Sequence, residues 1–311
     1  MSTIFLGTSE FAAAILERLA SSGQPPALVI TRPDRPSGRG RRLTAPPVAE
    51  RAGALGIALE QPASVNDPET WALIANAGGS GSSSSEGGER KTIIVCAFGA
   101  LIKEPLLSDH EILNIHPSLL PRWRGAAPIE RALMAGDEQS GVSIMRLTAG
   151  LDSGPVCLAA AEPIGPQDTY GSLALRLQEL GGDLLVRALR ERPPFREQSE
   201  EGVTYAEKIT AEDRLLDPGH SAVELERTVR ALQPHIGARL ALPDGTLLGV
   251  HRSALVDGEA EAEDPGVLVR EGRLLLQCTP GLLELSVVQP PGSRGMEAAA
   301  YLLGHDPTGR S

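Results

Sequence analysis

The N-terminal part of the chain alternates short apolar runs with segments of helical periodicity. Thr3–Leu6 is an apolar run of strand length. After it, Phe11, Ile15 and Leu19 stand four residues apart, so they share one face of a helix. Ala27–Ile30 is the next apolar run. This order predicts a βαβ unit, in which the two strands lie parallel in one sheet.

The same alternation continues well beyond this unit. Further strands are expected at Ile57–Leu59, Thr92–Ala97, Ile112–Ile115 and Gly141–Arg146. Further helices are expected at Pro47–Leu55, Asp67–Asn76, Pro128–Met134 and around Leu173–Leu184. Thr92–Ala97 is apolar throughout, as is typical of strands that are buried on both faces of a parallel sheet. The pattern therefore predicts an α/β domain with a mostly parallel sheet.

Two stretches interrupt this pattern. Ala77–Arg90 consists almost entirely of Gly, Ser and Glu, a composition that buries too little apolar surface to offset the entropy of ordering it. We expect it to be a disordered surface insertion. Residues 190–204 are charged and contain prolines, which is typical of a linker. We place a second domain from Tyr205 onward.

The second domain has a different pattern. Ser221 and Glu224 have capping-box spacing at the start of a helix. Short apolar runs separated by Asp-Gly and Glu-Gly turns follow, which predicts an antiparallel sheet. Its expected strands are Arg239–Leu242, Thr246–Val250, Val267–Arg270, Arg273–Gln277 and Leu282–Val288. A small barrel closed by a helix at Met296–Leu303 accounts for this order.

Composition excludes several classes of protein. With 41% hydrophobic and 22% charged residues, the 311-residue chain has the balance of a globular protein in aqueous solution. The net charge of −11 and the scarcity of aromatic residues argue against a general nucleic-acid coat protein. The three cysteines form no C-x-x-C, so neither a disulfide framework nor a zinc site is expected. No run is long enough to span a membrane, and we expect a cytoplasmic protein without metal.

The densest group of chemically active residues follows the strand predicted at Ile112–Ile115. Asn114 and His116 are two residues apart, so both side chains leave the strand on the same side. In an open α/β sheet, ligands bind at the carboxyl ends of the strands. An amide and an imidazole converging there suit catalysis, although a polar pair that merely caps the next turn would show the same spacing.

Two further groups have an ordinary alternative. Asp152 lies in a Gly-bounded loop after another strand, where it could orient an imidazole, but Asp-Ser-Gly-Pro is also common turn chemistry. Residues 31–42 hold five arginines and one aspartate, a local charge of +4. Such a loop attracts phosphate groups, or else it is simply solvated. Gly7-Thr8-Ser9 follows a strand but lacks the G-x-G-x-x-G spacing of a dinucleotide site.

Five stretches of the chain form a specific combination: Phe5–Phe11, Arg32–Arg42, Asn114–Pro121, Leu151–Gly154 and Thr204–Lys208. Together they resemble the methionyl-tRNA formyltransferases, a family that uses 10-formyltetrahydrofolate. The likeness extends over nearly the whole chain. It implies a Rossmann-like formyltransferase domain at 1–189, the linker at 190–204, and an OB-like β-barrel domain at 205–311 that helps to hold tRNA.

The resemblance also implies roles for individual residues. Catalysis would depend on Asn114, His116 and Asp152. The folate would contact Ser118, Leu119, Leu120 and Pro121, and the acceptor end of tRNA would contact Arg39, Arg41 and Arg42. The implied donor is 10-formyltetrahydrofolate, and the implied acceptor is initiator methionyl-tRNA. We expect a monomer that needs no metal.

The second domain departs from the charge expected of a tRNA-binding surface. Residues 205–311 hold 10 Lys and Arg against 16 Asp and Glu, a net charge of −6. A formyltransferase for a small amine, such as glycinamide ribonucleotide or an amino-sugar nucleotide, would use the same Asn, His and Asp. A hydrolase that releases formate would use them as well, and a protein that binds folate or tRNA without activity could share the same scaffold.

Overall fold

The computed structural model describes residues 2–37, 42–78, 91–256 and 264–309. The chain divides into two compact units. Unit 1 comprises residues 1–125, 140–162 and 174–205, and unit 2 comprises residues 126–139, 163–173 and 206–311. Apart from its first two positions, the expected insertion at Ala77–Arg90 lies outside the described residues.

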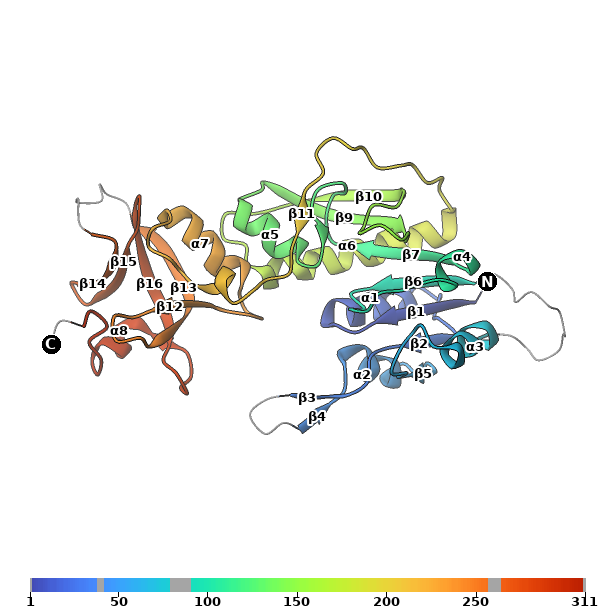
Figure 1. Ribbon diagram of the computed structural model, residues 1–311, viewed down its shortest axis with the longest axis horizontal. Coiled ribbons are helices and arrows are strands. Elements are labelled where there is room, and N and C mark those ends of the chain that lie inside the picture. The colour runs from blue at the N-terminus through green and yellow to red at the C-terminus, as the bar shows by residue number, and fades with distance from the viewer. Residues whose placement is uncertain (1, 38–41, 79–90, 257–263, 310–311) are drawn as a thin grey trace. The chain divides into compact units, whose positions relative to one another are not determined.

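Unit 1 is built on a seven-stranded sheet with the order β10-β9-β7-β6-β1-β2-β5 (Figure 1). The strands are β1 (Thr3–Gly7), β2 (Leu28–Ile30), β5 (Leu59–Glu60), β6 (Thr92–Cys96), β7 (Glu111–His116), β9 (Gln139–Arg146) and β10 (Val156–Pro163). The five strands from β5 to β7 run parallel, and β9 runs antiparallel to β7. The predicted α/β fold with a mostly parallel sheet is confirmed.

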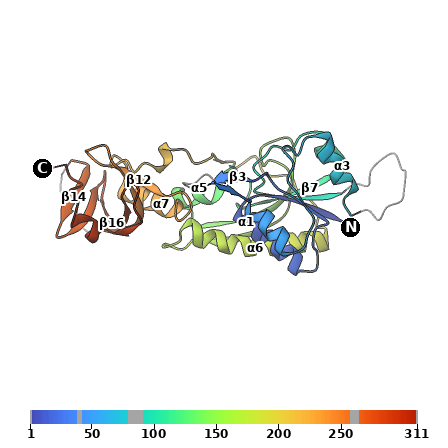
Figure 2. The ribbon, with the colours of Figure 1, turned by 90° about the horizontal axis from the view of Figure 1, so that it is seen from below.

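The helices of unit 1 cover both faces of this sheet. Figure 2 shows α1 (Glu10–Ser21) and α6 (Tyr170–Glu191) on one side and α3 (Pro68–Asn76) on the other. Helix α2 (Pro47–Ala54) packs against α1, and the short α4 (Leu106–Asp109) precedes β7. A Cβ at Gly181 of α6 would lie 3.3 Å from side-chain carbons of both Ile115 and Ile15. Glycine therefore allows α6 to approach the sheet closely, on the face that carries Ile115.

The strand order reverses beside β1, since β2 and β5 lie on one side of it and β6 and β7 on the other. Gly7 ends β1 at this position, and a Cβ there would lie 2.8 Å from Cβ of Ala12 and 3.1 Å from the Cys96 carbonyl oxygen. The glycine thus lets α1 begin directly against the sheet. Open α/β sheets bind ligands outside the carboxyl ends of the strands near such a reversal. Strand β7 ends at this edge with His116.

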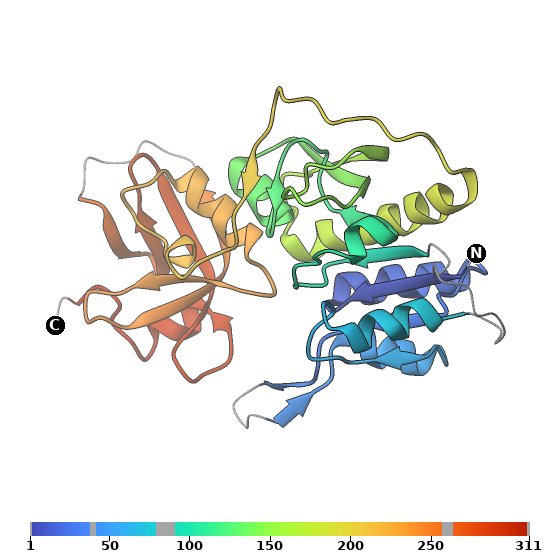
Figure 3. The ribbon, with the colours of Figure 1, turned by 45° about the vertical axis from the view of Figure 1, so that its right-hand side comes forward.

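Unit 2 contains an antiparallel half-barrel with the order β12-β13-β16-β15-β14, and β17 pairs with β16 (Figure 3). The strands are β12 (Ala238–Ala241), β13 (Leu247–Val256), β14 (Gly266–Arg270), β15 (Arg273–Gln277), β16 (Leu282–Gln289) and β17 (Met296–Glu297). Helices α5 (Pro128–Ala135), α7 (Ala222–Ala231) and α8 (Ala298–Leu302) complete the unit. Leu225 and Val229 of α7 share one apolar core with Leu283 and Leu285 of β16.

Several local predictions can be compared directly with these elements. The capping box of Ser221 and Glu224 is present at the start of α7. The helix expected from Met296 is shorter, because Met296 and Glu297 pair with β16 before the helix begins. Strand β10 was not predicted, since it is partly exposed and rich in alanine rather than β-branched residues. A strand was predicted at Ile57–Leu59, and the observed strand β5 begins two residues later, at Leu59.

The remaining elements are short. They are β3 (Arg35–Ser37), β4 (Arg42–Thr44), β8 (Arg124–Gly125), β11 (Tyr205–Ala206) and the 3₁₀ helix Glu212–Arg214. Strands β3 and β4 form a hairpin, and β8 pairs with β11. Within the described ranges, no helix combines the length and apolar character that a membrane span requires.

Candidate active site

Strand β7 presents Asn114 and His116 on the same face of the sheet. Asn114 lies opposite Met145 and His116 opposite Ser143 in the pairing with β9, while the intervening Ile115 faces α6. His116 is 4% exposed and Asn114 is 9% exposed. Two polar side chains are therefore held in an almost buried position at the carboxyl end of a parallel strand.

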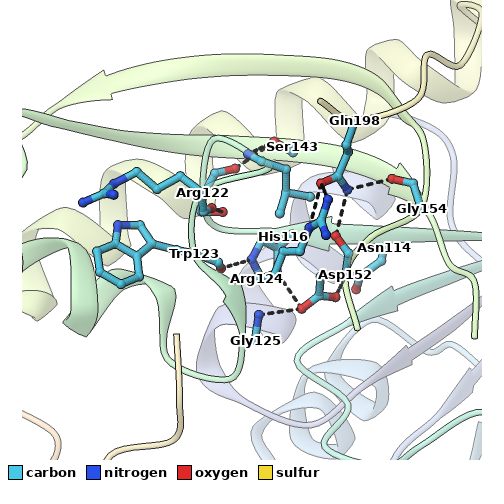
Figure 4. Close-up of polar contacts among 12 residues, drawn as sticks. Asn114, His116, Arg122, Trp123, Arg124, Gly125, Ser143, Asp152, Gly154 and Gln198 are labelled. Carbon is cyan, nitrogen blue, oxygen red and sulfur yellow. Dashed lines mark hydrogen bonds and ion pairs between the residues drawn. The ribbon is translucent and has the colours of Figure 1, made fainter. Parts of the chain in front are cut away.

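Asp152 reaches this pair from the connection between β9 and β10 (Figure 4). Its Oδ1 accepts a hydrogen bond from Asn114 Nδ2 at 3.5 Å, and its Oδ2 lies 3.6 Å from His116 Nδ1. The backbone N–H of Gly125 donates to the same Oδ2 at 2.9 Å. The structure thus brings together the three residues proposed for catalysis, although Asn114 and Asp152 lie 38 residues apart in sequence.

Asp152 has a backbone φ of +42°, in the left-handed region that residues other than glycine rarely adopt. Such a conformation costs of order 1–3 kcal/mol and persists only where the surroundings enforce it. The residue therefore forms a turn, as its sequence context suggests, and its carboxylate also faces the imidazole. The sequence left open whether Asp152 is a turn residue or a residue that faces the imidazole, and in the structure it is both.

The orientation of the imidazole is fixed by a backbone carbonyl. His116 Nε2 lies 2.8 Å from the carbonyl oxygen of Trp123. Because a carbonyl only accepts hydrogen bonds, Nε2 carries the proton in the neutral ring and Nδ1 is the basic nitrogen. The sequence suggested that Asp152 orients the imidazole. In the structure the Trp123 carbonyl fixes the tautomer, and Asp152 faces the other ring nitrogen, Nδ1.

The segment Ser118–Pro121 follows β7 and contacts Ser143 of β9. Ser118 is 1% exposed and its Oγ donates to the Arg122 carbonyl at 2.7 Å. Ser143 Oγ donates to the Ser118 carbonyl at 2.8 Å and accepts from the Leu120 N–H at 3.1 Å. The Ser118 side chain is therefore used to shape the turn. Its hydroxyl is not turned toward solvent.

Leu120 and Pro121 line a cavity of about 510 Å³ within unit 1. The same cavity is lined by the first residues of β10 and by part of the segment predicted as a linker. Its lining combines apolar surface with two side chains of opposite charge, Arg196 and Glu197.

The arginine-rich loop is described only in part. Arg39 and Arg41 lie outside the described residues. Arg42 begins β4, is exposed, and pairs through its backbone with Ser37 of β3. The structure therefore places Arg42 on an exposed hairpin of unit 1.

The thiol of Cys96 lies in β6, near this end of the sheet, and is fully buried. Burial raises the pKa of this thiol well above its ordinary value, so it stays protonated and inert. All three cysteines are free. Among the described residues, no group of His, Cys, Asp and Glu has an arrangement that could hold a metal ion.

Sequence reasoning missed several residues that hold this site in place. They are Trp123, Arg124, Gly125, Gln198 and Thr204. Gln198 and Thr204 lie in the segment predicted as a linker, and nothing in its charged composition indicated that they contact the loops of the site. Their role depends on chain folding between positions 74 to 81 residues apart, which local patterns do not reveal.

Comparison with known proteins gives matches to both parts of the chain. A family model described as formyl transferase matches residues 1–189, and one described as formyl transferase, C-terminal domain, matches residues 208–306. The methionyl-tRNA formyltransferase of Dechloromonas aromatica is 40% identical over 308 residues, which cover 98% of this chain and 96% of that protein.

Solved structures share the fold at low sequence identity. Methionyl-tRNA formyltransferase from Clostridium thermocellum has a TM-score of 0.58 and 14% identity, over 83% of this chain and 95% of that one. HypX from Aquifex aeolicus in complex with tetrahydrofolic acid has a TM-score of 0.60 and 16% identity. The match covers 97% of this chain and 47% of HypX, so the chain spans about half of that protein.

Proposed function

The chain belongs to the formyl transferase family, and we propose that it transfers the formyl group of 10-formyltetrahydrofolate to the α-amine of methionine on initiator tRNA. The observation that carries this proposal is the cluster of Asn114, His116 and Asp152 at the end of β7. Relatives that are 40% identical over 98% of the chain are named methionyl-tRNA formyltransferase, which supports this acceptor.

The reaction begins with attack of the neutral amine on the formyl carbon. An α-amino group has a pKa near 7.7–8.0, so a usable fraction is neutral at physiological pH. Attack places negative charge on the formyl oxygen. Asn114 Nδ2 donates one hydrogen to Asp152 and carries a second, which can donate to this oxygen. One such donor typically accelerates a reaction by roughly 10²–10³-fold.

His116 moves the proton. Its Nε2–H is held by the Trp123 carbonyl, so Nδ1 accepts the proton that the attacking nitrogen loses. The imidazolium is then stabilised by the Asp152 carboxylate, 3.6 Å from Nδ1. The same proton passes to the nitrogen of the folate as its bond to the formyl carbon breaks. Charge and protons balance without a covalent enzyme intermediate.

The binding residues follow from the same proposal. We assign contact with the donor to the segment Ser118, Leu119, Leu120 and Pro121, of which the last two line the cavity while the buried Ser118 side chain shapes the turn. We assign contact with the acceptor end of tRNA to Arg39, Arg41 and Arg42. The donor is a co-substrate and no metal takes part. The protein acts as a monomer in the cytoplasm, where initiator tRNA is charged.

The experiment that tests this function is formyl transfer from 10-formyltetrahydrofolate to methionyl-tRNA. Parallel reactions contain uncharged tRNA, glycinamide ribonucleotide or no acceptor. We expect formylation of methionyl-tRNA alone. Transfer only to the small amine, or release of formate without an acceptor, would overturn the tRNA assignment and leave the catalytic centre standing. No turnover of the donor with any acceptor would contradict both.

A further inference from the structure

Gln198 and Arg124 connect the catalytic loops of unit 1 through one continuous set of hydrogen bonds (Figure 4). Gln198 Nε2 donates to the carbonyl oxygens of Asp152 and Gly154, both at 2.7 Å. Gln198 Oε1 accepts from Arg124 Nε at 3.0 Å and from Nη2 at 2.8 Å. One side chain therefore links the Asp152 loop to the segment that follows β7.

The chemistry of the partners fixes which way the Gln198 amide points. Guanidinium groups only donate hydrogen bonds and carbonyls only accept them. Reversing the amide would turn its NH₂ toward Arg124 and its oxygen toward two carbonyl oxygens, so only the observed orientation satisfies all four bonds. Arg124 is 6% exposed, and its guanidinium reaches Gln198 inside the unit rather than in solvent. The link is thus specific, and its Arg124 end is shielded from water, which strengthens it, while Gln198 is half-buried and also lines the cavity of unit 1.

Arg124 also stands between the two backbone groups that orient the catalytic side chains. The residue before it, Trp123, supplies the carbonyl that holds His116, and the residue after it, Gly125, supplies the N–H that holds Asp152. Thr204 fixes the same segment, because its Oγ1 accepts from the Trp123 N–H at 2.9 Å and its carbonyl accepts from the Arg124 N–H at 2.9 Å.

We propose that Gln198, held by Arg124, is a positioning residue that keeps Asp152 at the distance from His116 that proton transfer requires. Asp152 needs such support because its backbone is in the left-handed region. The segment predicted as a linker thereby takes part in catalysis indirectly, through the geometry of the Asp152 loop. This inference rests on the proposed function only for its effect on turnover. The hydrogen bonds themselves can be tested without any assay.

The decisive variant is Gln198→Glu. A glutamate accepts from Arg124 as glutamine does, but it cannot donate to the Asp152 and Gly154 carbonyls and repels them instead. The matched control is Gln167→Glu, which makes the same change at an exposed position. We expect Gln198→Glu to lower kcat about 10–100-fold, with KM for methionyl-tRNA within about threefold, since small displacements of catalytic groups have effects of this size. The control should equal the parent.

Two further measurements separate positioning from a general structural role. In an Asp152→Asn background, Gln198→Glu should reduce kcat little further, because both changes act on the same carboxylate. Hydrogen exchange of the backbone amides at 150–155 should become faster in Gln198→Glu, while exchange in β6 and β7 stays unchanged. Independent losses in the double variant, or parental kcat with parental exchange, would overturn the proposal. If the parent transfers no formyl group, the proposed function fails, and hydrogen exchange alone decides whether Gln198 holds the loop.

Discussion

A histidine faces a carboxylate in each of the two units. In unit 1, His116 Nδ1 lies 3.6 Å from Asp152 Oδ2, beyond the length of a good hydrogen bond. In unit 2, His235 Nε2 lies 2.9 Å from Glu130 Oε1, which is a complete hydrogen bond. The pair with the better bond is the one that we assign to stability.

His235 uses one ring nitrogen and one ring face in contacts within unit 2, and its side chain is 30% exposed. The ring stacks on Tyr170 with the centroids 3.6 Å apart, and the Glu130 side chain is only 11% exposed. Burial, with a smaller contribution from the Glu130 charge, raises the pKa of Tyr170 to about 12, so the phenol remains neutral beside the pair. Glu130 comes from α5, Tyr170 from the first turn of α6, which belongs to unit 2, and His235 from the chain after α7, so these contacts join three segments of unit 2.

The hydrogen bonding of His116 is less complete than that of His235. Its Nε2 is fixed by a backbone carbonyl, but Nδ1 has only a loose contact with Asp152, and the Asn114 amide lies beside the same carboxylate. A histidine and a carboxylate in contact thus do not by themselves indicate catalysis. We base the proposed role of His116 on the incomplete contact together with its place at the end of a parallel strand, beside Asn114.

The largest loss of kcat is expected when the amide of Asn114 is removed. Asn114→Ala removes the proposed donor to the formyl oxygen and should lower kcat by roughly two to four orders of magnitude. Single-turnover formylation measures the loss, and circular dichroism checks that the fold is intact. Asp152→Asn, which keeps an acceptor for the Gly125 N–H but loses the charge, should show a loss of the same order. Near-parental turnover in Asn114→Ala would remove this residue from the mechanism.

The matching substitution in unit 2 should act on stability instead. His235→Ala leaves Glu130 buried without its partner and removes the stack on Tyr170, so the free energy of unfolding should fall by about 1–3 kcal/mol. Urea unfolding measures this loss. The kcat of the folded protein should stay within about threefold of the parent. A loss of kcat as large as that of Asn114→Ala would show that the two pairs were wrongly distinguished.

The carboxylate of Asp213 in unit 2 gives a test through the pH dependence of stability. Arg131 holds Asp213 at 2.7 Å, and this contact lowers the pKa of that carboxyl from 3.8 to about 2. Because the pKa is lower in the folded state, the stabilisation is complete above about pH 4 and is lost as the pH falls toward 2. Asp213→Asn should therefore cost about 2 kcal/mol at pH 7.

The difference between Asp213→Asn and the parent should shrink in urea unfolding curves recorded at successively lower pH. A constant difference between pH 7 and pH 3 would mean that the charge of Asp213 contributes nothing. Turnover at pH 7 should remain parental in this variant, as for His235→Ala.

The smallest effect is expected from Arg42 on the exposed hairpin. Arg42→Ala should weaken the use of methionyl-tRNA by a few-fold and reduce the slope of log affinity against log salt by about 1, because one phosphate contact is lost. The KM for the folate should not change. Arg187→Ala, on an exposed face of α6, is the matched control. Equal salt slopes for both variants would mean that the hairpin is simply solvated.

How much of the site the sequence predicts depends on the range over which each residue acts. The positions of Asn114 and His116 on one face follow from the two-residue period of β7, and the parallel strands follow from their apolar composition. The sequence did not predict strand β10, because an exposed edge strand needs no apolar alternation. It did not predict the roles of Gln198 and His235 for another reason. Their partners lie more than 40 residues away in the chain and meet them only after folding.

The most direct test of the account is to compare single-turnover formyl transfer to methionyl-tRNA in His116→Ala and His235→Ala at equal concentrations of folded protein. We predict that His116→Ala loses roughly two to four orders of magnitude in rate, while His235→Ala stays within about threefold of the parent. Similar rates in the two variants, or a His116→Ala protein that transfers at the parental rate, would contradict the assignment of the catalytic centre.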